Sequence, residues 1–380
     1  MDKQDYRNQI DRIDEQIVKL FTERMGIAAK IGDIKKENNL PILDAKRERE
    51  KLAAVTEMTP DELKDYTPLL YSMLFDLSRS YQARLSGYHT ALTGKLQDAI
   101  RDTPQLFPEF ASVACQGVEG ANSQFACDKM FRHANIMYFN SFDAVFTSIE
   151  KGLCRYGVIP VENSTAGSVN TVYDLMMNHK FYIVRSLRLK VDHNLLVKPG
   201  TKLEDIREIY SHEQALSQCS DYLSTMKGVR LIPYENTATA AKMVAESGRS
   251  DIAAIASRPC MKYYALDCLK ESIQNTDNNF TRFICISKDL QVFPGADRTS
   301  LMLTLPHEAG SLYKFLAKLY ALDINLIKLE SRPLPNRPFE FMFYFDFDTP
   351  VYSPRLQQLI GELPDICESF TYLGSYSEVV

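Results

Sequence analysis

The sequence predicts a multidomain fold with an all-helical N-terminal domain, a two-lobed α/β domain and a C-terminal α+β domain of ferredoxin-like order. Apolar residues in the first part recur every three or four positions, which is typical of amphipathic helices. Short apolar runs then alternate with helical stretches, as they do in α/β sheets. The last part follows the order strand, helix, strand, strand, helix, strand. We expect domains at residues 1–90, 108–290 and 298–380.

The composition is that of a globular protein, with 45% hydrophobic and 24% charged residues. A net charge of −5 gives no reason to expect a nucleic-acid partner. No apolar run reaches the ~20 residues of a membrane span, and the polar N-terminus lacks a signal-peptide core. The eight cysteines form no C-x-x-C pair and the six histidines no H-x-x-x-H pair. We therefore expect a cytoplasmic protein with reduced thiols, no metal, no cofactor and no membrane contact.

The N-terminal domain is expected to begin with one long helix. From Arg7 to Asn38 only Gly26 and Gly32 interrupt the helical pattern, and Pro41 closes it. Such a helix is roughly 45–50 Å long, at 1.5 Å per residue. A domain of this size cannot cover it, so we expect it to pack along a second chain in a homodimer or a higher homo-oligomer.

Two further helices are expected in this domain. Asp44 is a suitable N-cap for the second helix, and residues 59–62 read as a capping box that would start the third. Residues 86–108 lose the rhythm and read as a helix tail followed by a linker.

Two cations lie inside the apolar stripe of the first helix. At 100° per residue, Lys35 and the stripe's isoleucines and leucine all fall within about 40° of Arg24. A charge on a helix usually lies on the solvated face, but the phase places these two on the apolar face. Burying an unpaired cation costs several kcal/mol. They therefore need an anionic ligand or local acids. Arg7 lies ~25 Å away along the axis, so it would reach such a pocket only across a partner chain.

Together with polar residues on the next two helices, these cations form a series that resembles the active site of the all-helical chorismate mutases. The resemblance implies an intertwined dimer in which Arg7 enters the partner's pocket, and chorismate as the substrate. It implies that arginines bind the carboxylates, that Lys35 and Gln82 act as catalytic donors to the ether oxygen, and that the acids bind hydroxyl groups or orient the cations. The implied substrate-binding residues are Arg7, Arg24, Lys35, Asp44, Arg47, Glu48, Ser78 and Gln82.

The middle of the chain reads as an α/β domain with largely parallel sheets. A break near His193 would divide it into two lobes around a cleft. The expected strands are at residues 111–115, 136–139, 156–161, 182–184, 194–197, 230–233, 252–256 and 282–287. The expected helices between them are at residues 142–152, 169–178, 213–226 and 237–247.

Polar segments follow several of these strands and would line the cleft. The glycine turn at residues 117–123 lacks the G-x-G-x-x-G of a dinucleotide site, so NAD is not expected. Residues 162–168 gather backbone N–H groups and hydroxyls suited to an anion, although an N-capped turn is the plainer interpretation. Residues 211–219 and 237–241 repeat the arrangement, and residues 279–283 would line the same cleft.

These segments resemble the motifs of prephenate dehydratases over roughly residues 110–290. The resemblance implies that Thr281 is catalytic and assists departure of the ring hydroxyl of prephenate. Arg282 would bind a carboxylate or, alternatively, form an ion pair with Glu162 or another local acid. Asn122 departs from the family pattern, which usually has an aromatic residue there. The implied substrate-binding residues are Ser123, Glu162, Asn163, Ser164, Gln218, Thr237, Thr239, Thr281, Arg282 and Phe283.

The last domain resembles the ACT regulatory domain that senses L-phenylalanine in dehydratases. Residues 310–313 match its glycine motif in part, and residues 330–333 keep its Glu-Ser-Arg-Pro motif. The alternative is that Glu330 and Arg332 only pair at a subunit interface. The implied regulatory site comprises Gly310, Leu312, Asn325, Glu330, Ser331, Arg332 and Pro333.

The expected function is therefore that of a bifunctional chorismate mutase–prephenate dehydratase with allosteric inhibition by phenylalanine. It would convert chorismate to prephenate, then prephenate to phenylpyruvate, carbon dioxide and water. One alternative pairs the mutase with a prephenate dehydrogenase, which the absent dinucleotide motif disfavours. Others are a two-lobed solute-binding protein and a mutase whose dehydratase part has degenerated.

Overall fold

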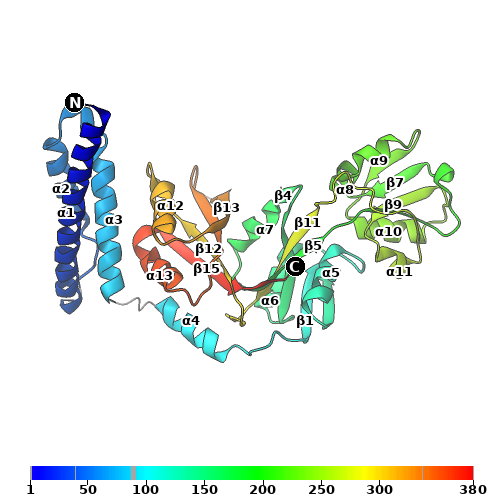
Figure 1. Cartoon of the computed structure of the whole chain (residues 1–380). Coiled ribbons are helices and arrows are strands. Elements are labelled where there is room, and N and C mark those ends of the chain that lie inside the picture. Colours follow the sequence, from blue (N-terminus) through cyan, green and yellow to red (C-terminus); the bar gives the residue numbers. More distant parts are fainter. Residues whose placement is uncertain (1, 39, 87–90, 336, 380) are drawn as a thin grey trace. The chain divides into compact units, whose positions relative to one another are not determined.

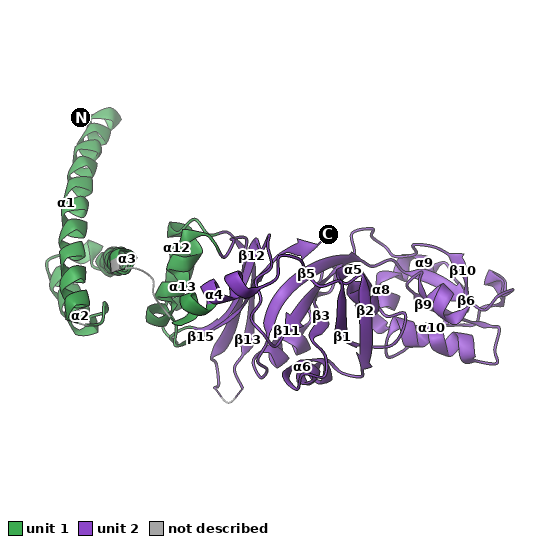
Figure 2. Ribbon diagram, turned by 90° about the horizontal axis from the view of Figure 1, so that it is seen from below, with its two compact units in different colours: residues 1–95, 305–324, 352–370 green, residues 96–304, 325–351, 371–380 purple. Residues whose placement is uncertain are grey.

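The computed structural model describes the chain except residues 1, 39, 87–90, 336 and 380 (Figure 1). These residues form two compact units (Figure 2). The first unit comprises residues 1–95, 305–324 and 352–370. The second comprises residues 96–304, 325–351 and 371–380. No helix in the described parts combines the length and apolar character needed to cross a membrane.

The first unit contains the long helix that the sequence predicts, α1 (Lys3–Glu37). Asp2 and Asp5 cap its start in a capping box, and no proline interrupts its 35 residues. Helices α2 (Ala45–Glu57) and α3 (Thr67–Ser86) follow, and both α1 and α2 pack on α3. A Cβ atom at Gly32 would come within 3.0 Å of Gln82 Cγ, so glycine lets α1 and α3 cross closely there.

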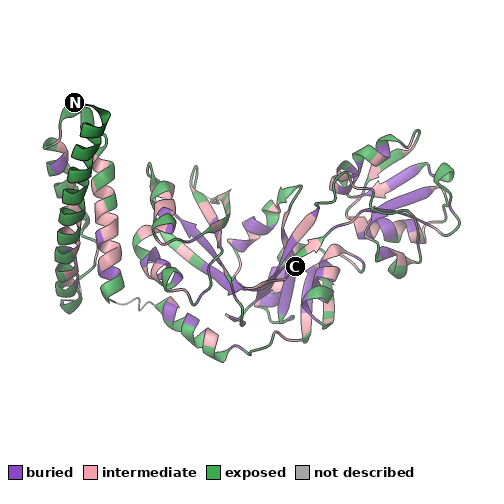
Figure 3. Cartoon of the chain, in the orientation of Figure 1, coloured by how far each residue is buried: buried purple, intermediate pink, exposed green. Residues whose placement is uncertain are grey.

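The apolar stripe of α1 is mostly exposed in the single chain, contrary to the expected burial (Figure 3). Ile13, Ile17 and Leu20 are 54%, 56% and 63% exposed, while the buried residues of α1 are Ala28 and Gly32. Helix α3 packs against α1, and among the described residues of α1 only Ala28 and Gly32 are buried. The rest of the stripe forms an apolar surface of the kind that marks an interaction site.

Two expectations about the helical segment are wrong. Thr59 closes α2 instead of capping the next helix, because its hydroxyl donates to the carbonyl of Val55 at 2.8 Å. Pro60 is extended and precedes only the short 3₁₀-helix η1 (Asp61–Leu63), so α3 starts later, at Thr67. The segment expected as a helix tail and linker also contains a separate helix, α4 (Ala91–Asp102), with a marked apolar face.

Two helices from the C-terminal part of the chain, α12 (Ser311–Ala321) and α13 (Pro354–Ile366), belong to the first unit. Helix α13 contacts α3 through polar groups. The Ser80 hydroxyl donates to Glu362 at 2.9 Å and accepts from the Gln358 amide at 2.8 Å. Glu362 also forms an ion pair with Lys318 of α12.

The second unit contains a seven-stranded sheet, which with α5–α7 we call the first lobe. The strand order is β16-β5-β11-β3-β1-β2, with β4 paired to β3. Helices α6 and α7 pack on one face, and α5 packs on the other. The strands are β1 (Phe110–Gln116), β2 (His133–Phe139), β3 (Tyr156–Asn163), β4 (Gly167–Ser168), β5 (Tyr182–Lys190), β11 (Phe280–Ser287) and β16 (Glu378–Val379); the helices are α5 (Asn122–Met130), α6 (Phe142–Glu150) and α7 (Asn170–Met176).

A five-stranded sheet with α8–α11 forms the second lobe. Its order is β10-β6-β9-β7-β8, and helices cover both faces. The strands are β6 (Asn194–Val197), β7 (Glu208–Ser211), β8 (Arg230–Pro233), β9 (Ile252–Ala256) and β10 (Asp267–Lys270), with the 3₁₀-helix η2 (Leu203–Asp205) before β7. The helices are α8 (Glu213–Gln218), α9 (Ser220–Ser224), α10 (Thr237–Glu246) and α11 (Cys260–Tyr264). The two predicted lobes are thus present, and the sequence missed β7 and β10.

The sheets are mixed, whereas the sequence predicted largely parallel ones. The reason is the return of the chain from the second lobe. It leaves the first lobe after β5 and re-enters as β11, which runs antiparallel to both β5 and β3. The two crossings lie side by side, since the Val191 amide donates to the Asn279 carbonyl at 2.8 Å.

A four-stranded sheet completes the second unit. Its order, β13-β14-β12-β15, is that of a ferredoxin-like sheet, and its strands and the two helices between them confirm the predicted element order. The strands are β12 (Arg298–Thr304), β13 (Leu326–Pro333), β14 (Phe341–Phe347) and β15 (Ser369–Tyr376). At Gly374 a Cβ atom would lie 2.1 Å from the Ile183 carbonyl oxygen, so the two sheets approach too closely there for any side chain.

Two candidate active sites

A cavity of about 500 Å³ opens among α1, α2 and α3 of the first unit. Its lining combines the side chains of all three helices with the segment that leads into α2. Seven of the eight residues predicted for the mutase line this cavity: Arg24, Lys35, Asp44, Arg47, Glu48, Ser78 and Gln82. The eighth, Arg7, is exposed and lies outside it, as its distance along α1 requires.

The two cations of the α1 stripe are held by neutral groups. The Arg24 guanidinium donates to the Ser78 hydroxyl at 2.5 Å and to the Leu74 carbonyl at 3.0 Å. The Lys35 ammonium donates to the carbonyl of Ile42. Within the described residues neither cation has an ion-pair partner. Both cations thus line the cavity, where they are half-buried and not held by local acids among the described residues.

The cavity carries a surplus of positive charge. Five basic and three acidic side chains line it, which gives the lining residues a surplus of two positive charges. Glu48 is engaged by Arg79, which also pairs with Asp76. Asp44 caps α2, since its carboxylate accepts from the Arg47 amide at 3.0 Å. The sequence did not single out Arg79, although its position three residues before Gln82 places both on one face of α3.

Gln82 supplies an unsatisfied polar group. It is 6% exposed, and its Oε1 has no hydrogen-bond partner among the residues that the structure describes. A buried amide oxygen without a partner costs free energy, so it marks a position where a ligand group is expected.

In the second unit, a cluster of amides and hydroxyls lies where β3 ends and β11 begins. Asn163 and Thr281 are paired across these strands, and the Asn163 amide donates to the Thr281 hydroxyl oxygen at 3.0 Å. The same amide nitrogen donates to Asn279 Oδ1 at 2.8 Å. Because Asn163 occupies an acceptor site on the Thr281 oxygen, the Thr281 proton remains available for a ligand.

The second lobe contributes a glutamine to this cluster. Gln218, at the end of α8, donates from Nε2 to the Thr165 hydroxyl at 2.5 Å. Its Oε1 lies 2.8 Å from His193 Nε2 and accepts from the Asn279 amide at 3.1 Å. Thr165 in turn donates to Asn163 Oδ1 at 2.6 Å. We call Asn163, Thr165, Gln218, Asn279 and Thr281 the amide cluster.

The structure therefore brings together the predicted Asn163, Gln218 and Thr281, and adds three residues. Asn279 and Thr165 lay within the polar segments that the sequence analysis singled out, but they had no assigned role. His193 was noted only as a break between lobes. Burial lowers the pKa of His193, so it is neutral near pH 7 and, in the tautomer protonated at Nε2, donates to Gln218.

Other residues predicted for the dehydratase stabilise the strand ends and helix starts near the cluster. The Ser164 hydroxyl donates to the Asn278 carbonyl at 2.8 Å and accepts from the Phe280 amide at 2.9 Å, which ties the two strand ends together. Thr239 closes a capping box with Asn236 at the start of α10. Thr237 is half-buried in the first turn of that helix.

Two more predicted residues are buried. Ser123 lies at the start of α5 and is 6% exposed. Phe283 is 2% exposed and packs in the core of the first lobe, because it is one residue past Arg282 on a central strand that is buried on both faces. Its expected contact with substrate is corrected to a role in packing.

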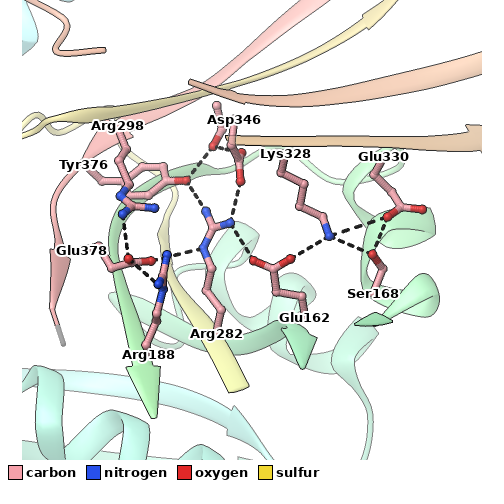
Figure 4. Close-up of polar contacts among 11 residues, drawn as sticks. Glu162, Ser168, Arg188, Arg282, Arg298, Lys328, Glu330, Asp346, Tyr376 and Glu378 are labelled. Carbon is pink, nitrogen blue, oxygen red and sulfur yellow. Dashed lines mark hydrogen bonds and ion pairs between the residues drawn. The ribbon is translucent and has the colours of Figure 1, made fainter. Parts of the chain in front are cut away.

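Arg282 forms the ion pair with Glu162 that was the alternative to binding a substrate carboxylate. Its guanidinium is 5% exposed and donates to Glu162 at 3.0 Å, to Asp346 at 2.6 Å and to the Tyr376 hydroxyl at 2.8 Å (Figure 4). These acids occupy the guanidinium, so the expected carboxylate contact of Arg282 is corrected to an internal ion pair. Burial acts to lower the pKa of Arg282, but the surrounding acids outweigh it and raise the pKa.

The residues predicted to bind phenylalanine fall in both units. Gly310 and Leu312 belong to the first unit, and the other five belong to the second. Glu330 bonds to Ser168, and Arg332 holds Asp174 through two hydrogen bonds of 2.7 and 2.8 Å. Glu330 and Arg332 thus contact the first lobe of their own chain, whereas Asn325, Ser331 and Pro333 are exposed.

Two family models match the chain in agreement with this geometry. Residues 6–83 match "Chorismate mutase type II", and residues 113–291 match "Prephenate dehydratase". The first range contains the cavity residues and the second contains the amide cluster.

Similar proteins carry the same combination. The chain is 30% identical to a bifunctional chorismate mutase/prephenate dehydratase of Aquifex aeolicus, over 98% of this chain and 97% of that protein. It is 37% identical to arogenate dehydratase/prephenate dehydratase 1 of Arabidopsis thaliana, over 70% of this chain and 71% of that protein. A prephenate dehydratase from Arthrobacter aurescens, solved in complex with L-Phe, is 25% identical with a TM-score of 0.64, and covers 70% of this chain and 89% of that one.

The helical cavity and the two-lobed domain therefore define a two-part enzyme, a mutase joined to a dehydratase. The chain belongs to the family of bifunctional chorismate mutase/prephenate dehydratases. It isomerises chorismate to prephenate and converts prephenate to phenylpyruvate, and it acts in phenylalanine biosynthesis. The alternatives of a dehydrogenase and of a solute-binding protein are excluded by this membership.

Proposed function

We propose that the cavity among α1, α2 and α3 binds chorismate and that the residues predicted from the sequence hold it. The observation that carries this proposal is a cavity with two surplus positive charges, in which Arg24 and Lys35 are held by neutral oxygens. Chorismate carries two carboxylates, and arginines such as Arg24 and Arg47 bind carboxylates through paired hydrogen bonds. The charge of the dicarboxylate thus balances the surplus of the cavity.

The rearrangement of chorismate needs no nucleophile or base. It needs the substrate held in a folded conformation, and it needs donors where negative charge grows on the breaking ether oxygen. Lys35 and the Gln82 amide group supply such donors from opposite helices. Ser78 orients Arg24, and Asp44 and Glu48 lie where they can accept from substrate hydroxyl groups.

We also propose that the mutase works as a homodimer or a higher homo-oligomer. The exposed isoleucines and leucine along the N-terminal half of α1 support a second chain on that surface. Arg7 lies at that end of α1 and would enter the cavity of the partner as a third carboxylate-binding arginine.

For the dehydratase we propose that prephenate binds against the amide cluster, between the lobes, and that Thr281 is the catalytic group. Loss of the ring hydroxyl and of carbon dioxide makes an aromatic ring, so the driving force is intrinsic to the substrate. The enzyme needs to orient the substrate and give a proton or hydrogen bond to the departing oxygen. Thr281 has a proton to donate because its oxygen accepts from Asn163. Gln218 and Asn163 would contact the substrate.

We propose that residues 298–380 form an ACT regulatory domain that binds L-phenylalanine, with domain boundaries at 1–90 and 108–290 for the two enzymes. The ferredoxin-like order and the phenylalanine bound to the Arthrobacter dehydratase support this. The site would include Gly310, Leu312, Asn325 and residues 330–333. All eight cysteines are free, which supports a reducing location such as the cytoplasm.

One assay tests the whole proposal. Chorismate is supplied to the purified chain, and phenylpyruvate is followed by its ultraviolet absorbance with and without L-phenylalanine. We expect phenylpyruvate to form without any added cofactor, and the rate to fall when L-phenylalanine is present. Accumulation of prephenate without phenylpyruvate would contradict the dehydratase assignment, and an unchanged rate with phenylalanine would contradict the regulatory one.

A further inference from the structure

Strand β13 of the C-terminal sheet presents a row of charges to the first lobe of the dehydratase. Side chains alternate between the two faces of a strand, so Lys328, Glu330 and Arg332 share one face. Each of the three bonds to a residue of the first lobe, and the two that lie nearest the amide cluster meet at Ser168 (Figure 4).

Lys328 reaches both ends of one loop. Its ammonium donates to Glu162 Oε2 at 2.7 Å and to the Ser168 hydroxyl at 2.9 Å. Glu162 is the last but one residue of β3, and Ser168 ends β4, to which β3 is paired. The hairpin loop between them, residues 163–167, is closed by the pairing of Asn163 with Gly167 and carries two members of the amide cluster, Asn163 and Thr165.

The same end of the sheet therefore has two faces with different tasks. Thr281 pairs with Asn163, and their neighbours Arg282 and Glu162 pair one step along the strands. Neighbouring residues of a strand point to opposite sides, so the catalytic pair lies on one face and the ion pair lies on the other. Lys328 and Asp346 of the C-terminal sheet bind the ion pair from that second face.

These charges are buried enough to hold their geometry. Lys328 is 16% exposed and Glu162 is 29% exposed. Burial acts to raise the pKa of Glu162, but the hydrogen bond from Lys328 and the charges of Arg282 and Lys328 outweigh it and lower the pKa. Glu162 is thus ionised at neutral pH, and charge-assisted hydrogen bonds of this kind are short and strong.

We propose that Lys328 is a positioning residue of the dehydratase: it clamps both ends of the loop 163–167 and so holds Asn163 and Thr165 against Thr281 and Gln218. A residue of the C-terminal sheet thereby completes the active site of another part of the chain. A displacement of about 1 Å in such a group is enough to slow a reaction up to a hundredfold. The inference rests on the proposed roles of Asn163 and Thr281.

The test compares two variants that each remove one contact of β13 with the first lobe. Lys328→Met keeps the length of the side chain and loses the charge, which frees the loop. Asp174→Asn weakens the contact of Arg332 with α7, away from the loop. With supplied prephenate, we expect kcat of Lys328→Met to fall about ten- to hundredfold with KM changed less than kcat. Asp174→Asn should keep kcat within twofold, and Lys328→Arg should recover part of the loss.

A purely adhesive role of β13 would give another pattern. Lys328→Met and Asp174→Asn would then lower the unfolding temperature to similar extents, and both would have the same kcat. Equal kcat values in the two variants overturn the proposal. If Lys328→Met does not fold, Ser168→Ala releases the far end of the loop without removing a charge, and we expect a several-fold lower kcat. An unchanged kcat in that variant overturns the proposal as well. Thr281→Val distinguishes failure of the proposed function from failure of this inference. If Thr281→Val keeps full dehydratase activity, the proposed function fails. If Thr281→Val loses the activity and Lys328→Met keeps it, only the inference fails.

Discussion

The two candidate sites of this chain are held in opposite ways. In the helical cavity, the described partners of Arg24 and Lys35 are neutral oxygens, and an apolar helix face beside them is exposed. In the dehydratase, each member of the amide cluster has a partner, and buried ion pairs brace the strands from behind. The first site has cations without acid partners among the described residues and an exposed apolar surface beside it. The second is pre-organised within one chain.

This contrast follows from the chemistry of each step. A rearrangement that creates no new bond to the enzyme is served by fixed positive charge. Holding such charge without an anion destabilises the folded protein until a dianion binds. A dehydration that needs one hydroxyl in one orientation is served by a rigid hydrogen-bonded frame. Variants of the two sites should therefore fail independently.

The largest effect is expected for Lys35→Ala. Loss of the ammonium removes the donor to the ether oxygen, so kcat/KM for chorismate should fall about a thousandfold. Dehydratase activity on supplied prephenate should remain. Lys30→Ala, on the exposed side of the same helix, is the matched control. A joint loss of both activities in a folded Lys35→Ala protein would mean that the two sites are not separate.

Thr281→Val should give the reverse pattern. The substitution keeps the volume and removes the hydroxyl, so the dehydratase rate should fall about a hundredfold while chorismate is still consumed. Thr281→Ser keeps the hydroxyl and should retain much of the rate. Full phenylpyruvate formation by Thr281→Val would exclude Thr281 from the chemistry.

A smaller effect would test the open surface of α1. If Arg7 enters the partner's cavity, Arg7→Ala and Lys35→Ala should each be inactive as mutases. Mixed subunits would form some heterodimers with one intact cavity of two, so random mixing should restore about a quarter of wild-type mutase activity. Co-expression with two affinity tags isolates the heterodimer. No recovery in the isolated heterodimer would show that each cavity uses the Arg7 of its own chain.

The smallest effect concerns the stability of the braced site. The lowered pKa of Glu162 means that its folded form binds a proton less readily than its unfolded form, whose ordinary value is 4.5. Its stabilisation is therefore present above pH 4.5 and is lost as the pH falls through the lower, folded value. Glu162→Gln should reduce the free energy of unfolding by about 2 kcal/mol at pH 7, and by less at pH 4. Urea unfolding at the two pH values measures this, with the exposed Glu235→Gln as control. A difference that grows toward pH 4 would contradict the ion pairing.

The sequence was a good guide wherever one local rule decides the outcome. The phase on α1 predicted that Arg24 and Lys35 share one face, and both line the same cavity, because helical periodicity alone determines which face a side chain shares. The order of the last strands and helices was equally readable. The start of α3 was missed because the Thr59 hydroxyl bonds to a carbonyl at the end of α2. The local sequence does not show whether such a threonine ends one helix or begins the next.

Contacts between distant segments could not be predicted from local patterns. The antiparallel return of β11 depends on where the chain re-enters the first lobe, and the partners of Arg282 come from β3, β14 and β15. His193 joined the amide cluster only through Gln218 of the second lobe. The sequence named the residue types of the sites, and the tertiary fold decided which of them face a ligand and which face each other.

Separate sites on one chain can be tested in a single mixing experiment. Lys35→Ala and Thr281→Val are assayed alone and together, with chorismate as the only substrate and phenylpyruvate as the readout. Each variant alone should form almost none, and the mixture should form it readily, since prephenate released by Thr281→Val is consumed by Lys35→Ala. A mixture no faster than the sum of the two variants would contradict the account.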